Sequence, residues 1–259
     1  MTATTAAALP EGSVRTTIAD GIGTVEFAHP KGNSLPGKLL HELAAAITAV
    51  GEDPAARVIV LRSAGASTFC AGASFDEFTA IADAEAGQEF FSGFSRVILA
   101  MVRAPKFVLT RVQGRAAGGA IGLIAASDYS IAVRGAQAKL SALQVGIGPF
   151  VVGVVIERKL GLAAFMNLGV HADWHDAEWC ERHGLYSMLV DDAAALDTMV
   201  AQHAARLAAS NPEAMREMKR IFWAGSEGWE ARMRERAGMS GRMVLSDFTR
   251  QALDRFRTR

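Results

Sequence analysis

The sequence predicts an α/β protein with a helical carboxy-terminal region, and three observations support this prediction. Short, almost wholly apolar segments at residues 58–61 and 107–112 are typical of strands that are buried on both faces of a sheet. Each segment is followed by a loop of small residues and then by a helical pattern, which is the order found in α/β folds. From about Asp176 onward, helical patterns dominate.

The first expected element is a β-hairpin. Residues 14–18 and 24–27 are rich in β-branched side chains, and Asp20-Gly21 between them supplies residues that tolerate the positive φ of a tight hairpin turn. After a loop at 30–34, apolar residues at helical spacing predict a helix that ends near Gly51. These residues are Leu39, Leu40, Leu43 and Ile47.

Two strand–loop–helix units follow the hairpin and the first helix. The first has a strand at 58–61, a loop at 63–74 and a helical pattern through Phe75, Phe78 and Ile81. The second has a strand at 107–112, a loop at 114–119 and a helix at 120–126, with a further strand at 129–133. The main helical runs after these units are expected at 192–210, 212–223 and 227–257.

Composition narrows the class of protein. Half of the 259 residues are hydrophobic, so the chain can bury a large core. Lys plus Arg equals Asp plus Glu at 27 each, so neither nucleic acid nor a membrane surface is an expected partner. The two cysteines, Cys70 and Cys180, have no disulfide or metal spacing, and no secretory leader or 18-residue apolar run occurs. We therefore expect a cytoplasmic protein.

Two loops of small residues stand out as candidate anion-binding sites. They lie in the stretches at 69–75 and 112–120, each where a strand gives way to a helix. The first N–H groups of such a helix have no partner within it and can bind a negatively charged oxygen. Taken singly, each loop is also explained as a tight turn that uses glycine for packing or positive φ. Together, about 40 residues apart and each after an apolar strand, they favour a shared oxyanion site.

Other catalytic patterns are absent from the sequence. The stretches around Gly21 and Gly146 lack the third glycine of a dinucleotide fingerprint, and neither a P-loop nor a nucleophile elbow occurs. His171 and His175 are four residues apart, but the glutamate of the zinc-protease pattern is missing, so we interpret them as a surface pair. No metal site is expected.

The ordered features resemble the enoyl-CoA hydratase/isomerase (crotonase) family over nearly the whole chain. They are the opening hairpin, the Pro-Lys…Asn-Ser-Leu loop, the Phe-x-Ala-Gly-Ala loop, the Gly-x-x-x-Gly-Gly helix start and the helical carboxy-terminal region. The resemblance implies a spiral of ββα units. On this basis we expect a flexible tail at 1–12, a core at 13–194 that holds the CoA and acyl pocket, and a helical region at 195–259 for trimerisation or capping.

The resemblance also implies site residues. The backbone N–H groups of Ala73 and Gly119 would form the oxyanion hole, and the loop at 71–73 would hold the adenine end of CoA. Lys31 is the candidate phosphate contact. The residues expected to bind CoA or substrate are Lys31, Ser34, Ala71, Gly72, Ala73, Phe75, Gly118, Gly119, Leu143 and Phe150. No cofactor beyond the CoA moiety of the substrate is implied, and the assembly would be a homotrimer or a dimer of trimers.

The chain departs from the family at its acid and base positions. Hydratases of the family carry two glutamates that fall here on Gly122 and Ala142, neither of which can transfer a proton. Other members of the family carry a carboxylate further along the sequence, at a position that falls here on Phe150 and its neighbours, none of which is acidic. Of the remaining acids, Glu157 and Asp76 are the leading candidates for proton transfer, although such carboxylates more often have structural roles, as Asp76 would in the first turn of a helix.

Three functional hypotheses follow. The leading one is an acyl-CoA enzyme of enoyl-CoA hydratase/isomerase type that stabilises a thioester enolate in a backbone oxyanion hole. A second is a non-catalytic acyl-CoA-binding paralogue that has kept the pocket. A third is a family decarboxylase, or an enzyme of another acyl-CoA reaction that needs no such glutamates. Hydrophobic residues around the pocket predict a hydrophobic acyl group, whose length and branching stay open.

Overall fold

The computed structural model describes residues 11–257, whose strands form two sheets. In the larger sheet the strand order is β1-β2-β3-β5-β7-β10, and all neighbours are parallel except β1 and β2. Its strands are β1 (Ser13–Ala19), β2 (Ile22–Ala28), β3 (Val58–Ser63), β5 (Val108–Val112), β7 (Tyr129–Val133) and β10 (Met188–Val190). Most of the tail predicted at 1–12 lies outside the described residues.

The smaller sheet has the order β4-β6-β8-β9, with only β9 antiparallel to its neighbour. Its strands are β4 (Thr68–Cys70), β6 (Arg115–Ala117), β8 (Ala138–Lys139) and β9 (Trp174–His175). Three successive strand pairs, β3-β4, β5-β6 and β7-β8, each give their first strand to the larger sheet and their second to the smaller one. A helical segment follows each pair, so the chain forms the expected spiral of ββα units.

The helices of the core pack beside these sheets. They are α1 (Gly37–Glu52), α2 (Phe75–Thr79), α3 (Ala84–Arg103), α4 (Gly119–Ala125), α5 (Phe150–Leu160), α6 (Leu162–His171) and α7 (Ala177–Arg182), with a 3₁₀ turn η1 (Ser141–Val145). α1 packs on β1, β2 and β3 through one apolar face, and α3 lies beside α1. None of the described helices is both long and apolar enough to cross a membrane.

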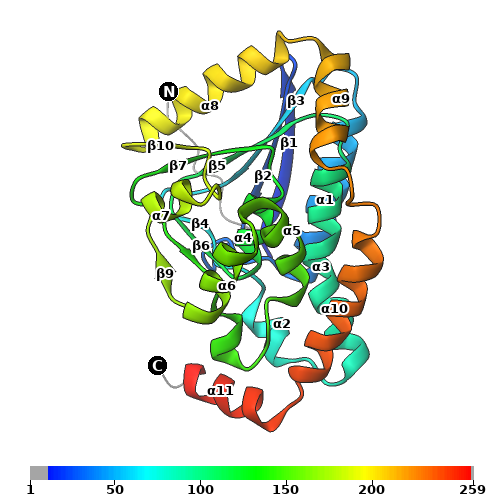
Figure 1. Cartoon of the computed structure of the whole chain (residues 1–259), viewed down its shortest axis with the longest axis vertical. Coiled ribbons are helices and arrows are strands. Elements are labelled where there is room, and N and C mark those ends of the chain that lie inside the picture. Colours follow the sequence, from blue (N-terminus) through cyan, green and yellow to red (C-terminus); the bar gives the residue numbers. More distant parts are fainter. Residues whose placement is uncertain (1–10, 258–259) are drawn as a thin grey trace.

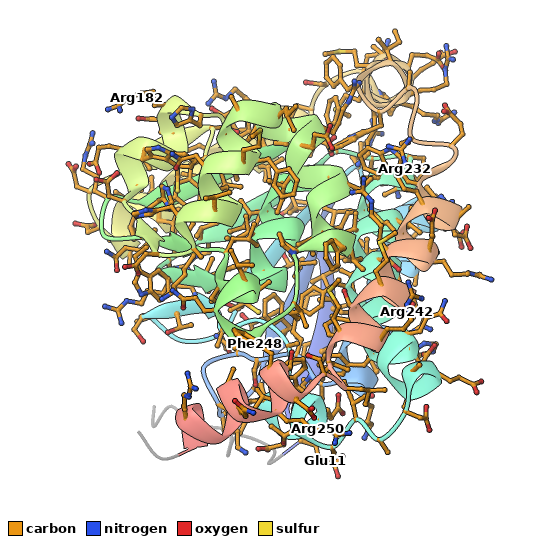
Figure 2. The ribbon with its side chains drawn as sticks, turned by 60° about the horizontal axis from the view of Figure 1, so that its bottom comes forward. Glu11, Arg182, Arg232, Arg242, Phe248 and Arg250 are labelled. Atoms are coloured by element: carbon orange, nitrogen blue, oxygen red, sulfur yellow. The ribbon has the colours of Figure 1, made fainter. Side chains whose placement is uncertain are left out.

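The carboxy-terminal helices are α8 (Ala193–Ala208), α9 (Pro212–Phe222), α10 (Trp229–Met243) and α11 (Asp247–Arg257). α8 contacts β2, β3, β5 and β7 and so covers one face of the larger sheet, while α10 runs alongside α3 (Figure 1). Figure 2, seen from the end where α11 lies, shows this helix crossing that end of the molecule. The helical carboxy-terminal region is therefore confirmed.

The local signals explain where elements begin. Asp20 and Gly21 have φ of 52° and 76°, so the hairpin turn is the positive-φ type that its sequence predicts. Asp192 caps α8 by accepting a hydrogen bond from the Ala195 N–H at 2.8 Å. Asn211 caps α9, whose first residue is Pro212.

The structure corrects several element predictions. The loops expected at 63–74 and 114–119 contain β4 and β6, which at three residues each are too short to give a strand pattern. β10 lies in the region where almost only helices were expected. The helical pattern expected through Phe75, Phe78 and Ile81 forms the short helix α2, and α3 is a separate helix that follows it. The run expected at 227–257 divides into α10 and α11, because Ser246 accepts a hydrogen bond from the Thr249 N–H and caps a new helix.

Candidate active site

The first small-residue loop leaves β4 and leads into α2. Gly72 has a φ of +95°, and a Cβ there would lie 2.8 Å from the carbonyl oxygen of Ala117, so only glycine fits. Ser74 then caps α2, since its side chain accepts a hydrogen bond from the Glu77 N–H. Leu35 pairs with this loop through a hydrogen bond from its N–H to the Gly72 oxygen at 2.8 Å. These contacts fix the direction of the Ala73 N–H.

The second loop connects β6 to α4. Gly118 adopts a φ of 56° and donates its N–H to the Lys139 oxygen at 2.9 Å. Gly119 begins α4, and a Cβ on it would lie 2.4 Å from the ring of Phe94. The absence of a side chain therefore lets the start of α4 pack directly against α3.

The two loops contact each other in the wall of a cavity. A Cβ on Gly72 would lie 3.7 Å from the Gly119 nitrogen, so the loops are in contact. Among the described residues, neither the Ala73 N–H nor the Gly119 N–H donates a hydrogen bond. Both residues line the same cavity. Two unpaired donors in the wall of an apolar cavity can bind an oxygen that carries a developing negative charge.

The cavity measures about 210 Å³ and is almost entirely apolar. Phenylalanine dominates its wall, with contributions from α2, α3 and α5: Phe75, Phe78, Phe90, Phe91, Phe94 and Phe150. The polar side chains in its lining are those of Ser141 and Ser240. Within residues 11–257, no Asp, Glu, His, Lys, Arg, Cys or Tyr contributes to the lining. The described part of the chain therefore gives the lining no side chain suited to general acid or base catalysis.

The two positions at which the sequence resemblance led us to expect glutamates, Gly122 and Ala142, differ in their surroundings. Gly122 is buried within α4, and a Cβ on it would lie 2.8 Å from Val152 Cγ1 and 3.1 Å from Ile98 Cδ1. No side chain fits there unless its neighbours move. Ala142 lies on η1 and lines the cavity. Only the second position is therefore open to a larger side chain.

Both acids that sequence reasoning favoured lie outside this cavity. Glu157 is exposed in the last part of α5, and Asp76 is exposed on α2, where it forms an ion pair with Lys31. Neither contributes to the cavity lining. Their positions near the motifs in the sequence suggested proximity, but both side chains point to solvent. The geometry gives neither a role in proton transfer within the cavity.

The predicted CoA and acyl contacts are only partly brought together. The cavity lining includes Ala71, Gly72, Ala73, Phe75, Gly118, Gly119 and Phe150. Lys31 lies outside it, and the buried Ser34 hydroxyl contacts His29 Nδ1 at 3.0 Å. Leu143 is 53% exposed and does not line the cavity, which Ser141, Ala142 and Val145 of η1 line instead.

Sequence reasoning missed several residues of the lining. Phe90, Phe91 and Phe94 come from α3, whose amphipathic pattern could have revealed them, since they recur at helical spacing. Ser240 comes from α10, more than 100 residues further along the chain, and no local pattern marks it.

Cys70 lies beside the first loop but does not serve as a nucleophile. Its thiol is fully buried, and burial raises its pKa to about 12. A thiol with this pKa stays protonated near neutral pH, and the thiol is far less nucleophilic than the thiolate. Its sulfur instead accepts a hydrogen bond from the Gly72 N–H at 3.3 Å. Cys70 therefore supports the loop.

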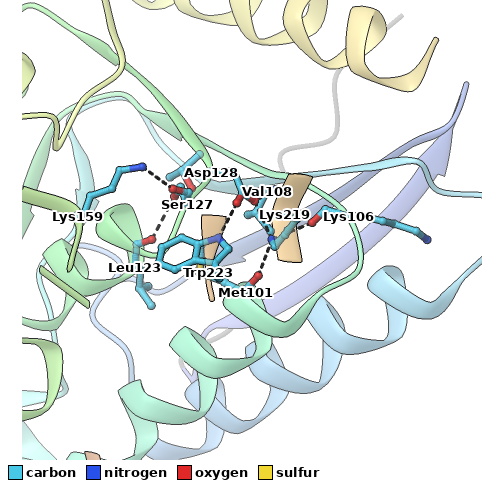
Figure 3. Close-up of polar contacts among 10 residues, drawn as sticks. Met101, Lys106, Val108, Leu123, Ser127, Asp128, Lys159, Lys219 and Trp223 are labelled. Carbon is cyan, nitrogen blue, oxygen red and sulfur yellow. Dashed lines mark hydrogen bonds and ion pairs between the residues drawn. The ribbon is translucent and has the colours of Figure 1, made fainter. Parts of the chain in front are cut away.

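Asp128 is a structural residue. One of its carboxylate oxygens accepts hydrogen bonds from the Val108 N–H and from Lys219 Nζ, both at 2.7 Å (Figure 3). The other accepts a hydrogen bond from Trp223 Nε1 at 2.8 Å. These contacts connect α9 to β5 and the end of α4, away from the cavity lining.

The interpretation of His171 and His175 as a surface pair is wrong for His175, which packs in the interior. His175 is buried, with its Nε2 2.8 Å from Asn167 Oδ1, and its ring lies 5.2 Å from that of His171. No cluster of three potential metal ligands occurs among residues 11–257.

Comparisons with known proteins agree with this architecture. The family model described as enoyl-CoA hydratase/isomerase matches residues 17–257. The carnitinyl-CoA dehydratase of Proteus mirabilis is 28% identical over 76% of this chain and 75% of its own, and the 1,2-epoxyphenylacetyl-CoA isomerase of Escherichia coli is 28% identical over 74% of each. The crystal structure of enoyl-CoA hydratase from Bacillus halodurans superposes with a TM-score of 0.85 at 20% identity, covering 93% of this chain and 99% of that one. The chain therefore belongs to the enoyl-CoA hydratase/isomerase family.

Proposed function

We propose that the protein is an acyl-CoA enzyme that binds the thioester oxygen of its substrate through the backbone N–H groups of Ala73 and Gly119. The observation that carries this proposal is that these two donors, which make no hydrogen bond within the described residues, belong to contacting loops that line one apolar cavity. As negative charge develops on the thioester oxygen, each donor contributes about 3 to 4 kcal/mol of stabilisation. Because both donors belong to the backbone, their positions depend on the glycines of the two loops.

The CoA moiety lies along the first loop in this proposal. The backbone of Ala71 and Gly72 binds its adenine end, and Phe75, which is 41% exposed, lies at the boundary between cavity and solvent. Lys31 contacts a phosphate group. Since Lys31 forms an exposed ion pair with Asp76, the phosphate has to compete with that carboxylate, and such exposed pairs are weak enough to be displaced. No other cofactor takes part.

The reaction is one that needs no acid or base from the cavity wall. With Gly122 and Ala142 at the two expected glutamate positions, and with Glu157 and Asp76 exposed, hydration by the usual route has no side chain to activate water. Loss of CO₂ from a substrate that carries a carboxylate on its α-carbon fits better. The C–C bond breaks, its electron pair forms the thioester enolate bound by the two N–H groups, and water protonates the α-carbon.

A second candidate is a non-catalytic acyl-CoA-binding protein, favoured by the packing around Gly122. Val152 and Ile98 fill the space that a side chain at position 122 would occupy, so the cavity has no room for the first glutamate. The same donors and apolar walls would bind a thioester without changing it.

Three measurements on the purified protein separate these functions. Loss of the conjugated thioester absorbance of crotonyl-CoA reports hydration, release of CO₂ from methylmalonyl-CoA reports decarboxylation, and calorimetric titration reports affinity for both thioesters. We expect binding of both and turnover of the carboxylated thioester alone. Binding without any turnover would favour the non-catalytic candidate. Rapid hydration of crotonyl-CoA would contradict both, because it would require an acid or base within the site.

Assembly remains a prediction of the family resemblance. We propose a homotrimer or a dimer of trimers, in which the helical region at 195–259 contributes to subunit contacts. Sedimentation equilibrium tests this directly, since a chain of 27.5 kDa gives well-separated masses for monomer, trimer and hexamer.

A further inference from the structure

The cavity wall is unusually rich in aromatic rings. Phe90 and Phe91 of α3 meet edge to face, with centroids 5.1 Å apart at 88°, and Phe78 of α2 meets Phe91 at 6.0 Å and 82°. A ligand ring that enters such a wall can form further edge-to-face contacts, each worth about 2- to 10-fold in affinity beyond the burial of its surface. An alkyl chain of equal carbon count gains only the burial.

One hydroxyl in this wall is poorly satisfied. Ser240 of α10 is 1% exposed and lines the cavity. The acceptor that its Oγ reaches, the carbonyl oxygen of Arg236, is 3.4 Å away, whereas O–H···O bonds normally span about 2.5 to 3.0 Å. Buried polar groups are as a rule well hydrogen-bonded. A weakly bonded hydroxyl in an apolar cavity can therefore form a better hydrogen bond with a polar group of a ligand.

Ser240 lies well away from the two oxyanion donors. The residue that follows it, Gly241, packs against Gly87 of α3, where a Cβ would lie 2.6 Å from the Gly241 Cα. Gly119 packs against Phe94, which also belongs to α3. Phe94 lies seven positions beyond Gly87, which corresponds to about 10 Å along the helix axis. This span suits a thioester carbonyl, a short spacer and a ring with a substituent at its far end.

We propose that the natural acyl group is an aromatic ring joined to the thioester by a short spacer, with a hydroxyl or carbonyl group at the far end of the ring that bonds to Ser240. The proposal rests on the proposed function, since it takes the thioester oxygen to lie at Ala73 and Gly119. It goes further by naming the class of acyl group and the residue that selects it.

Three thioesters that are saturated at the α- and β-carbons and have the same number of acyl carbons test the proposal by calorimetric titration. They are 3-(4-hydroxyphenyl)propanoyl-CoA, 3-phenylpropanoyl-CoA and nonanoyl-CoA, and none contains the conjugated double bond that hydration needs. We expect the unsubstituted ring to bind about 10-fold more tightly than the chain. The ring hydroxyl should add about fivefold, as expected for one net hydrogen bond.

The variant Ser240→Ala separates the hydrogen bond from ring packing. It should reduce the affinity ratio between the hydroxylated and the unsubstituted ring to about one, whereas Ser141→Ala, at the other hydroxyl of the cavity, should keep the fivefold ratio. Thermal unfolding of both variants checks that they fold. A ratio that persists in Ser240→Ala would overturn the role of Ser240. Equal binding of ring and chain would overturn the acyl class but leave the proposed function standing, and failure of all three thioesters to bind would overturn both.

Discussion

Four glycines near the two loops are needed for different physical reasons. Gly72 and Gly118 adopt positive φ, which L side chains rarely tolerate. Gly119 and Gly122 instead allow close packing against Phe94 and Val152. A Gly-rich helix start thus serves ligand binding and helix packing at once, so the motif alone does not separate the two uses.

Substitution of Gly122 tests the packing use. Gly122→Ala places a Cβ 2.8 Å from Val152 Cγ1 in the core, and overpacking of this kind costs about 1 to 3 kcal/mol. Urea denaturation should show a lower free energy of unfolding by that amount. Gly135→Ala is the matched control, because a Cβ on Gly135 meets nothing within 4 Å. Equal stability of the two variants would show that the core around Gly122 has space to spare.

Substitution of Ala142 tests whether a missing carboxylate limits hydration. Ala142 faces the cavity, so Ala142→Glu brings a carboxylate to the acyl group, where it can orient and deprotonate water. We expect crotonyl-CoA hydration at least about 10-fold faster than in Ala142→Gln, which matches it in shape but cannot accept the proton. Equal rates in the two variants would show that a single carboxylate at this position is insufficient.

At the scale of elements, a buried ion pair holds α9 in place. Lys219 Nζ donates to the Met101 oxygen of α3 at 2.7 Å, to the Lys106 oxygen at 2.9 Å and to Asp128 Oδ2 (Figure 3). All three of its N–H donors are therefore used. A buried pair satisfied in this way is tolerated, but removal of one partner leaves an uncompensated charge.

Loss of Lys219 should therefore destabilise the whole fold. Lys219→Met leaves Asp128 buried without its counter-charge, at a cost of about 3 to 5 kcal/mol in the free energy of unfolding. Its neighbour provides the control, because Arg220 forms only an exposed ion pair with Glu217, and Arg220→Met should change stability by less than about 0.5 kcal/mol. Urea denaturation measures both. A small loss for Lys219→Met would mean that water or a rearranged side chain satisfies Asp128.

At the scale of the whole molecule, three histidines make stability depend on pH. Burial lowers the pKa of His29, His175 and His203 below 6.5 in the folded protein. Well above pH 6.5 the three histidines are largely neutral in both the folded and the unfolded protein, so their contribution to stability is fully present. As the pH falls below 6.5, the unfolded chain binds protons first, so stability is lost until the pH reaches the folded-state pKa.

His203 offers a way to isolate this effect. Its ring stacks on Tyr129 with centroids 4.4 Å apart, and its buried Nδ1 has no hydrogen-bond partner in the described part of the chain, so His203→Phe keeps the stacking and removes the titrating group. We expect the variant to lose less stability than the natural protein between about pH 7.5 and pH 5.5, as measured by urea denaturation at each pH. An equal loss of stability in the variant and the natural protein would show that other groups control the fall in stability at acid pH.

The sequence predicted the parts of this fold that have strong local signals. The hairpin, the strands at β3, β5 and β7, and the small-residue loops follow from β-branched runs, turn residues and glycines that are close in the chain. Strands of two or three residues, such as β4 and β8, are held by pairing with distant strands and give no periodic pattern. The contribution of Ser240 likewise depends on how α10 packs on α3. Its place in the cavity wall, and the exclusion of Glu157 from it, could therefore come only from tertiary structure.

The infrared spectrum of a bound thioester tests the central claim most directly. A saturated acyl-CoA labelled with carbon-13 at its carbonyl gives a band whose frequency falls as hydrogen bonds polarise the C=O group. If the N–H groups of Ala73 and Gly119 bind this oxygen inside the apolar cavity, the band of the bound thioester lies at lower frequency than that of the free thioester in water. A bound band at equal or higher frequency would contradict the assignment of these two donors.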